Sequence, residues 1–208
     1  MLTHIIDDKK AKLMSKLYFR YGAMNSGKST ALLQVAYNYQ ERGQIAVIAK
    51  PTIDTKDVNV LSRIGMARPV DIHVSPDTDM VEAFLELGRN KQEVIDCLIV
   101  DEAQFLSPSQ INGLFNIAVG LNVPVLAYGL RTDFQGKAFP GSLRLLEIAH
   151  SLEEMKTICR CGRKALFNGR KLDGAFVREG AQVAIDGQHA EYESLCGQCF
   201  IEKVGPLN

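Results

Sequence analysis

Short apolar runs recur along the chain, and each is followed by a glycine or a polar residue. Five of them stand out, at residues 16–21, 45–49, 70–74, 97–100 and 123–128. The runs at 45–49, 97–100 and 123–128 are almost continuously apolar, which is typical of strands buried on both faces of a parallel sheet. We therefore predict five strands.

The segments between these runs have apolar residues at helical spacing. Helices are predicted at residues 28–43, 79–87, 107–119 and 142–149. In the second, Met80, Phe84 and Leu87 fall at i, i+4 and i+7, so they share one face. The third has Ser107 as a good N-cap and Pro108 at the first helical position.

Strands alternate with helices over most of the chain. This order indicates parallel βαβ units, and thus an α/β fold whose parallel sheet carries helices on both faces. Residues 54–68 have no clear period and 131–141 are polar, so both are expected to be connectors. After about residue 157, cysteines, glycines and short polar turns replace the apolar runs. We expect a polar, flexible tail at 1–15, an α/β domain at 16–157 and a small module at 158–208.

Composition narrows the class of protein. Among 208 residues, 24 basic side chains balance 24 acidic ones, and 46% of the residues are hydrophobic. That apolar share excludes a mainly disordered chain, and no apolar run approaches the ~20 residues of a membrane-spanning helix. The first residues include acids and lack an apolar core, so no secretory signal is expected and the location should be cytoplasmic. Zero net charge argues against nucleic acid as a partner, and no membrane partner is expected.

A phosphate-binding loop is the firmest motif. Residues 22–29 read Gly-Ala-Met-Asn-Ser-Gly-Lys-Ser, which fits G-x-x-x-x-G-K-[ST] between a predicted strand and a predicted helix. The glycines let backbone N–H groups face a phosphate, Lys28 can reach the β- and γ-phosphates, and the Ser29 hydroxyl can ligate Mg²⁺. The alternative is a plain glycine turn before a helix. The motif predicts nucleoside-triphosphate binding.

Two acids follow the apolar run at 97–100. Asp101 lies at the carboxyl tip of a predicted parallel strand, where it can hold Mg²⁺ opposite Ser29. Glu102 should point away from Asp101 if the strand geometry continues, which leaves it free as a general base; the alternative is a solvated loop acid. An ATPase and a kinase look alike at this point, and Asp-Glu-Ala-Gln also resembles the box of nucleic-acid helicases.

Two cysteine pairs, Cys159-x-Cys161 and Cys196-x-x-Cys199, lie in the last fifty residues. Four thiolates in two close pairs suit tetrahedral Zn²⁺, and such a metal would hold together a module too small to build its own core. Disulfide or redox use and unligated thiols are the alternatives.

The first cysteine pair departs from the usual spacing, because a zinc ribbon normally has two or more intervening residues. Gly162 could relieve the resulting strain. His189 and Cys97 are the reserve ligands if one thiolate is out of reach. Cys97 lies inside an apolar run and is expected to be inert core packing.

With these motifs in place, the chain closely resembles the cytosolic thymidine kinases of the zinc-containing type, particularly bacterial ones, from about residue 17 to residue 199. Matching strings stand at residues 21–30, 38–43, 62–65, 100–105, 128–134, 157–165 and 192–199. Several such strings in the right order are more specific than the phosphate loop alone. The resemblance implies a RecA-like P-loop core and a C-terminal zinc-binding module that carries a lasso loop.

The resemblance also implies an activity, namely ATP-dependent phosphorylation of the 5′-hydroxyl of thymidine or deoxyuridine, giving dTMP in nucleoside salvage. Glu102 matches the family's general base, and Asp101 its Mg²⁺-linked acid. The ATP-binding positions are Gly22, Ala23, Met24, Asn25, Ser26, Gly27, Lys28, Ser29, Thr30, Asp101, Glu102, Ala103 and Gln104. Family members are usually homotetramers and are inhibited by the end product dTTP.

The nucleoside pocket is implied in the same way. Met24, Phe105, Leu130 and Phe134 match its positions, although the two phenylalanines have a second interpretation as core aromatics. The lasso would span residues 167–192. Its nucleoside-contacting residues would be Val183, Ile185, Gly187 and Tyr192.

Some positions depart from the family pattern. Many members carry Gly-Gly at 186–187, or at 187–188 in a shifted register, whereas this chain keeps one glycine. Lys56 stands where relatives often have Arg, which exchanges a forked phosphate contact for a point charge. Arg131 has two open interpretations, as a group that stabilises the transferring phosphate or as a solvated side chain. Two other functions remain as alternatives, a nucleic-acid motor ATPase and a non-catalytic, nucleotide-gated zinc adaptor.

Overall fold

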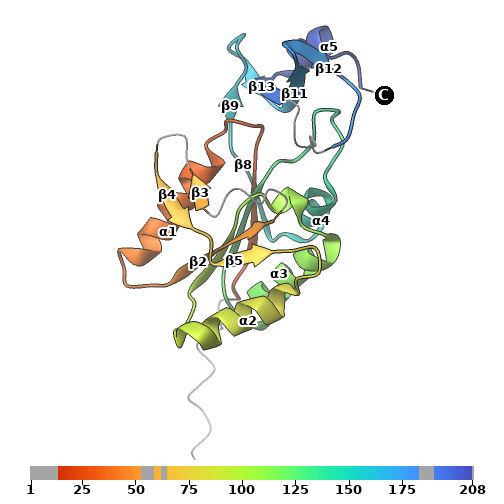
Figure 1. Ribbon diagram of the computed structural model, residues 1–208. Helices are drawn as coiled ribbons and strands as arrows, with labels where there is room; N and C mark the ends of the chain where they lie inside the picture. The colour runs from red at the N-terminus through yellow and green to blue at the C-terminus, as the bar shows by residue number, and fades with distance from the viewer. Residues whose placement is uncertain (1–13, 53–58, 62–64, 183–189, 208) are drawn as a thin grey trace, which may run out of the picture.

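A six-stranded parallel sheet forms the centre of the molecule. The computed structural model describes residues 14–52, 59–61, 65–182 and 190–207, and its strand order is β5-β2-β6-β7-β1-β8 (Figure 1). The strands are β1 (Leu17–Tyr21), β2 (Ala46–Pro51), β5 (Ile72–Val74), β6 (Cys97–Val100), β7 (Val125–Gly129) and β8 (Ser151–Glu154). Every neighbouring pair is parallel, which confirms the predicted class of sheet.

Edge strand β8 was not predicted from the apolar pattern. Its sequence is Ser-Leu-Glu-Glu, and none of its residues is fully buried. It pairs with β1 along one side only, from Tyr18 opposite Ser151 to Tyr21 opposite Glu154. Because an edge strand need not bury both faces, its polar sequence lacks the signal that identified the central strands.

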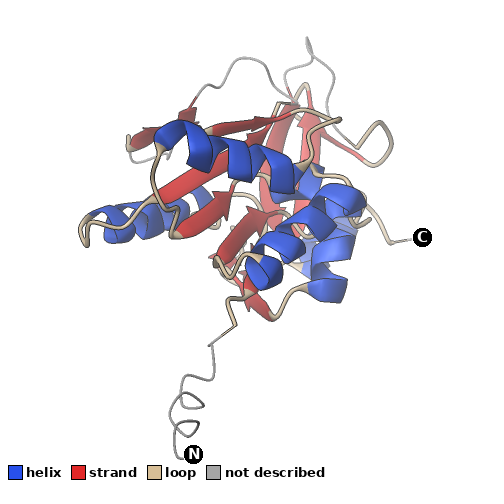
Figure 2. Cartoon of the chain, turned by 90° about the horizontal axis from the view of Figure 1, so that it is seen from below, coloured by secondary structure: helices blue, strands red, loops and turns tan. Residues whose placement is uncertain are grey.

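Helices cover both faces of the sheet, as Figures 1 and 2 show. They are α1 (Lys28–Gln40), α2 (Met80–Lys91), α3 (Pro108–Gly120) and α4 (Pro140–Ile148), with a 3₁₀ turn η1 (Ala103–Phe105). Helix α1 packs on one face, where Leu32 and Ala36 meet Ile48 and Ile99 of the strands. Helices α2, α3 and α4 pack on the other face.

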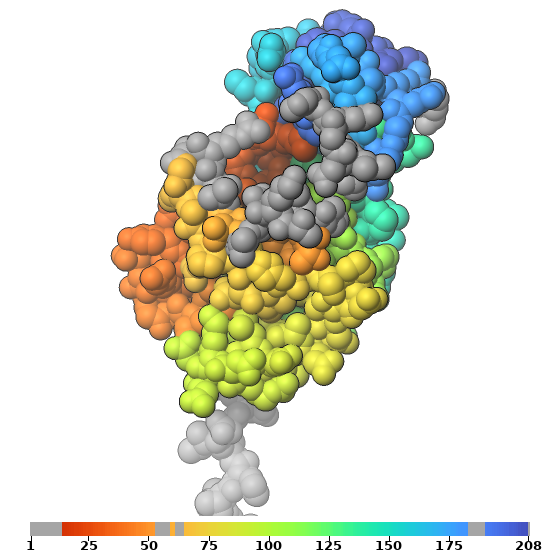
Figure 3. Space-filling model, in the orientation of Figure 1, coloured from red at the N-terminus to blue at the C-terminus, as the bar shows by residue number. Residues whose placement is uncertain are grey.

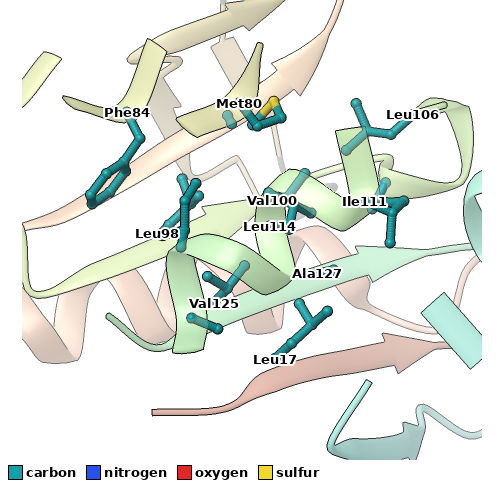
Figure 4. Packing of buried hydrophobic residues seen from close by; sticks show 14 of the residues in the cluster. Leu17, Met80, Phe84, Leu98, Val100, Leu106, Ile111, Leu114, Val125 and Ala127 are labelled. Carbon is teal, nitrogen blue, oxygen red and sulfur yellow. The ribbon is translucent and has the colours of Figure 1, made fainter. Parts of the chain in front are cut away.

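Of the apolar clusters on the two faces of the sheet, the larger lies under α2 and α3. Met80 and Phe84 of α2 lie against the same apolar cluster as Leu98 of β6, together with Ile111 and Leu114 of α3 (Figure 4). Burying each such side chain contributes roughly 1.5–3 kcal/mol to folding. The i, i+4, i+7 spacing that predicted α2 therefore identified the face of the helix that packs in the core.

A side-chain cap sets the start of one helix, and a proline sets the start of another. Ser107 caps α3 and forms a reciprocal capping box with Gln110, as its position before Pro108 predicted. Helix α4 begins at Pro140, two residues before the predicted start, because Pro140 occupies the first helical turn.

A connector was predicted at 54–68, and this prediction was wrong in part. Strands β3 (Asn59–Leu61) and β4 (Ala67–Pro69) pair as an antiparallel ribbon. Val60 is buried in the core beneath α1. Strands of three residues are too short to show a period, so tertiary packing rather than pattern defines them.

The chain after residue 156 forms a separate set of small sheets. These elements are β9 (Thr157–Ile158), β10 (Lys164–Ala165), β11 (Phe167–Leu172), β12 (Ala175–Val177), β13 (Ala190–Leu195) and α5 (Gly197–Lys203). We call them the C-terminal module; in Figure 1 it lies at one end of the molecule. The domain limits at 15 and 157 stay predictions.

Among the described residues, no helix combines the length and apolar character required to traverse a bilayer.

Candidate functional site

The predicted phosphate loop lies between β1 and α1. Asn25 and Gly27 have positive φ angles of 62° and 77°, which curl the backbone before the helix. A Cβ at Gly22 would lie 2.5 Å from the carbonyl oxygen of Met155, so only glycine fits there. The turn leaves the start of α1 without a side-chain cap, as a loop that receives an anion would require.

Lys28 is folded over this loop. Its Nζ donates to the carbonyl oxygen of Ala23 at 3.0 Å and to the Ser26 hydroxyl at 3.4 Å. Lys28 also lowers the pKa of Asp101, so the lysine and the acid act on each other electrostatically. Because β1 and β6 run parallel on either side of β7, the phosphate loop after Tyr21 and the acids after Val100 lie at the same edge of the sheet, although Lys28 and Asp101 are 73 residues apart in sequence.

Asp101 is 5% exposed and directly follows β6. Burial, together with the neighbouring Glu102, raises the pKa of its carboxyl to about 7, while Lys50 and Lys28 oppose the shift. A buried carboxylate of this kind is stabilised by a cation placed against it. Its chemistry therefore suits a divalent metal ion, as the sequence predicted.

Glu102 leaves the strand geometry on which its predicted direction depended. Its φ is +50°, in the left-handed region, and η1 follows immediately. A turn, and not strand alternation, thus aims the carboxylate. One carboxylate oxygen, Oε2, accepts a hydrogen bond of 2.5 Å from Nε2 of Gln104.

Gln104 has a role that sequence reasoning missed. Its side chain is 1% exposed; besides donating to Glu102, it accepts a hydrogen bond of 3.0 Å from the backbone N–H of Leu130. A Cβ at Gly129 would lie 2.7 Å from its Oε1, so a glycine makes room for this amide. Gln104 was expected to bind ATP, but both ends of its amide contact protein groups.

The described residues of the expected nucleoside pocket differ in how they are held. The hydroxyl of Ser142 donates to the carbonyl of Leu130. Phe105 is half-buried and makes an edge contact with Phe139, with ring centroids 5.5 Å apart. Phe134 is 1% exposed, so its interpretation as a core aromatic stays open.

Arg170 of β11 is a second residue that the sequence did not single out. Its guanidinium lies 3.8 Å from the Phe134 ring centroid, and its Nε donates to the Tyr192 hydroxyl at 2.9 Å. It also donates to the carbonyl groups of Ala181 (2.8 Å) and Gln182 (2.9 Å). One buried arginine thereby joins two expected pocket residues to residues 181 and 182 of the expected lasso. Nothing in its local sequence distinguishes it from a surface arginine.

The remaining expected positions fall into two groups. Arg131 lines a small cavity together with Gly22 and Ala23 of the phosphate loop. Lys56, Val183, Ile185, Gly187 and His189 lie outside the described residues.

The four C-terminal cysteines converge on one point. Their Sγ atoms all lie within 4.8 Å of one another, and those of Cys161 and Cys196 are 3.5 Å apart. Tetrahedral zinc with bonds of about 2.3 Å requires sulfurs roughly 3.8 Å apart. The donor set therefore fits a metal ion, and all four cysteines are free of disulfides.

Local backbone explains how the short first pair can join the cluster. Gly162 has a φ of +85°, and its N–H bonds to the carbonyl of Cys159, which makes the tight turn that one spacer residue demands. At the second pair, the backbone N–H of Cys199 donates to Sγ of Cys196 at 3.5 Å and lowers the pKa of that thiol. A thiol that ionises readily is a better metal ligand.

Cys97 lies away from this cluster, in the core beneath α1. It is fully buried, and burial raises the pKa of its thiol to about 12. Its predicted role as inert packing agrees with both observations.

Known proteins with similar sequences point in one direction. A family model described as thymidine kinase matches residues 15–200. The chain is 49% identical over 187 residues to a thymidine kinase of Rhizobium meliloti, covering 88% of this chain and 94% of that protein. It is 47% identical over 186 residues to one of Enterobacteria phage T4, with the same two coverages. It is 46% identical over 195 residues to one of Ruegeria pomeroyi, covering 92% and 96%.

Proposed function

We propose a reaction for this chain, which belongs to the thymidine kinase family. It is an ATP-dependent deoxynucleoside kinase that phosphorylates thymidine, and deoxyuridine, at the 5′-hydroxyl. The product from thymidine would be dTMP, formed in nucleoside salvage. The observation that carries the proposal is the arrangement of the sheet, in which the parallel strands β1 and β6 bring the phosphate loop and the acids after β6 to the same edge.

The chemistry follows from the chain's own groups. The 5′-oxygen attacks the γ-phosphorus of ATP, the bond from that phosphorus to the bridging oxygen breaks, and ADP leaves. Glu102 accepts the proton of the hydroxyl as general base. Loop N–H groups and Lys28 hold the phosphates, and the lasso keeps water from competing with the nucleoside.

Two metals belong to the proposal. Mg²⁺ held by Ser29 and Asp101 would, when bound, neutralise charge on the β- and γ-phosphates. The buried carboxyl of Asp101, with its raised pKa, supports this assignment. A structural Zn²⁺ on Cys159, Cys161, Cys196 and Cys199 is supported by the spacing of their sulfur atoms.

The ligand contacts carry over from the resemblance. Residues 22–30 and 101–104 are proposed to bind ATP, and Met24, Phe105, Leu130, Phe134 and Tyr192 to line the nucleoside pocket. Val183, Ile185 and Gly187 are proposed to complete it. Contact of Arg170 with both Phe134 and Tyr192 supports a common pocket.

The resemblance also supports a homotetramer, inhibition by dTTP and a cytoplasmic location. Light scattering after size exclusion measures the first, and inhibition of turnover by added dTTP measures the second. A monomer at working concentration would contradict the proposed homotetramer, and turnover unaffected by dTTP would contradict the proposed inhibition. Neither result would bear on the proposed reaction.

The family match over residues 15–200 favours the kinase over the motor ATPase and the adaptor. The decisive experiment offers the purified chain a panel of nucleosides with ATP, with and without a zinc chelator. We expect phosphorylation of thymidine and deoxyuridine and its loss after chelation. ATP hydrolysis stimulated by single-stranded DNA, with no nucleoside phosphorylated, would overturn the proposal.

A further inference from the structure

A cross-strand pair in the C-terminal module touches the phosphate loop. Asn168 of β11 and Ser194 of β13 are direct partners in the antiparallel register, so their side chains emerge on the same face of the sheet. Asn168 is 3% exposed and Ser194 7%. Both reach Met24, which lies more than 140 residues earlier in the sequence.

The pair binds both backbone polar groups of Met24. The N–H of Met24 donates to Oδ1 of Asn168 at 2.7 Å, and the hydroxyl of Ser194 donates to the carbonyl oxygen of Met24. The N–H of Met24 is therefore occupied by protein and is not a phosphate donor here. Within the expected ATP-binding stretch, Met24 is instead the residue through which the C-terminal module binds the loop.

Two further hydrogen bonds extend this contact. Nδ2 of Asn168 donates to the carbonyl of Thr132, in the connector after β7, at 3.2 Å. The hydroxyl of Thr157 donates to the carbonyl of Asn25, the residue after Met24, at 3.3 Å. In Figure 3 the blue C-terminal module lies directly above the red-to-orange part of the chain that contains the loop.

We propose that Asn168 and Ser194 are positioning residues that hold the phosphate loop in its ATP-binding conformation. The loop must curl through positive φ angles at Asn25 and Gly27, and external hydrogen bonds on Met24 fix the residue where that curl begins. The C-terminal module, which carries β11 and β13, thereby sets the affinity for ATP as well as gripping the nucleoside. This inference rests on the proposed binding of ATP at the loop.

Asn168→Ala and Ser194→Ala test the proposal through the Kd for Mg·ATP, measured by calorimetry without any nucleoside. Removing Asn168 leaves a buried N–H without its acceptor, so we expect the Kd to rise about tenfold or more, and about threefold or more for Ser194→Ala. In turnover assays the KM for ATP should rise by similar factors, while kcat at saturating ATP stays within about threefold of wild type.

Glu193→Gln is the matched control, since Glu193 neighbours Ser194 on the opposite face of β13 and binds Lys171 and Lys203. It should lower the stability of the module and leave the Kd for ATP within about twofold. Hydrogen exchange of the peptide containing residues 22–30 gives a second readout, and Asn168→Ala should accelerate it.

Unchanged ATP affinity and unchanged loop exchange in both alanine variants would overturn the proposal, as would an equal loss of affinity in the control. If wild-type protein binds ATP but phosphorylates no nucleoside, the proposed function fails while this inference stands. If it binds no ATP, the exchange measurement alone decides whether the pair holds the loop. If Asn168→Ala does not fold, the test rests on Ser194→Ala, which removes one oxygen atom only.

Discussion

The side-chain amide of Gln104 donates a hydrogen bond of 2.5 Å to the carboxylate of Glu102. The same amide accepts a hydrogen bond from the backbone N–H of Leu130, so the proposed base and a proposed pocket residue share one buried partner. An acid that must meet a substrate hydroxyl needs a fixed orientation, and Gln104 supplies it from within the core.

We expect Gln104→Ala to lower kcat about tenfold while the KM for ATP stays within about twofold, because both ends of the side-chain amide bind protein groups and one of them orients Glu102. Gln110→Ala is the control. Gln110 is also a buried glutamine, but it belongs to the capping box of α3 and donates to the carbonyl of Ser75. It should reduce stability with kcat unchanged. A raised KM for ATP with normal kcat in Gln104→Ala would favour a direct ATP contact instead.

Glu102→Gln should lower kcat about 100-fold or more, because the amide cannot accept the proton of the 5′-hydroxyl. The Kd for Mg·ATP should change little. Glu147→Gln, which alters a surface acid paired with Arg144, should turn over at the wild-type rate. Normal turnover by the Glu102 variant would remove the general-base role and revive the non-catalytic adaptor.

Cys161→Ser should reduce bound zinc from about one ion per chain to near zero, because four sulfur donors are needed to close the site. Metal content by mass spectrometry and the thermal midpoint measure the effect, and we expect both to fall. Cys97→Ala is the control, since Cys97 packs in the core beneath α1 and is no part of the cluster. It should keep its zinc. Full zinc content in the Cys161 variant would mean that another group serves as ligand.

Glu193 should make the C-terminal module sensitive to acid. It is 8% exposed and faces Lys171, Lys203 and Arg160, and the hydrogen bond from Lys171 in particular lowers its pKa to about 2. A lowered folded-state pKa means that the contribution is complete above the unfolded pKa of about 4.3 and is lost as pH falls toward 2.

Glu193→Gln should therefore reduce the free energy of unfolding by about 1–3 kcal/mol at neutral pH. The difference from wild type should shrink between about pH 4 and pH 2, when wild type also becomes protonated. Glu191→Gln, at an exposed position on the same strand, should stay within about 0.5 kcal/mol of wild type. A difference that is constant down to pH 2 would contradict the assigned pKa.

Gly141→Ala should destabilise the fold by about 1–3 kcal/mol, because its Cβ would lie 2.6 Å from the carbonyl oxygens of Ala103 and Leu106. Gly120→Ala offers the contrast, since a Cβ at that helical position meets nothing within 4 Å. It should raise stability by about 0.5–1 kcal/mol. Thermal unfolding of the two variants measures both, and equal effects would show that the close packing of α4 on η1 carries no energetic weight.

Pattern alone predicted most of the sheet, because buried central strands must be apolar on both faces and amphipathic helices must follow the helical period. It failed at β8 and at the β3–β4 ribbon, where an exposed edge or a length of three residues removes the signal. The candidate site motifs could also be found from sequence, since a phosphate loop, an acidic pair and paired cysteines are local in sequence.

The sequence by itself determined the α/β class, the phosphate loop, Asp101, Glu102 and the four cysteines. Tertiary structure alone decided how they are held: Gln104 on Glu102, Arg170 on Phe134 and Tyr192, and Asn168 with Ser194 on Met24. These supporting groups are ordinary polar residues, and what distinguishes them is burial beside a partner far away in the chain. No local pattern records such a partner, because folding and not spacing brings the two together.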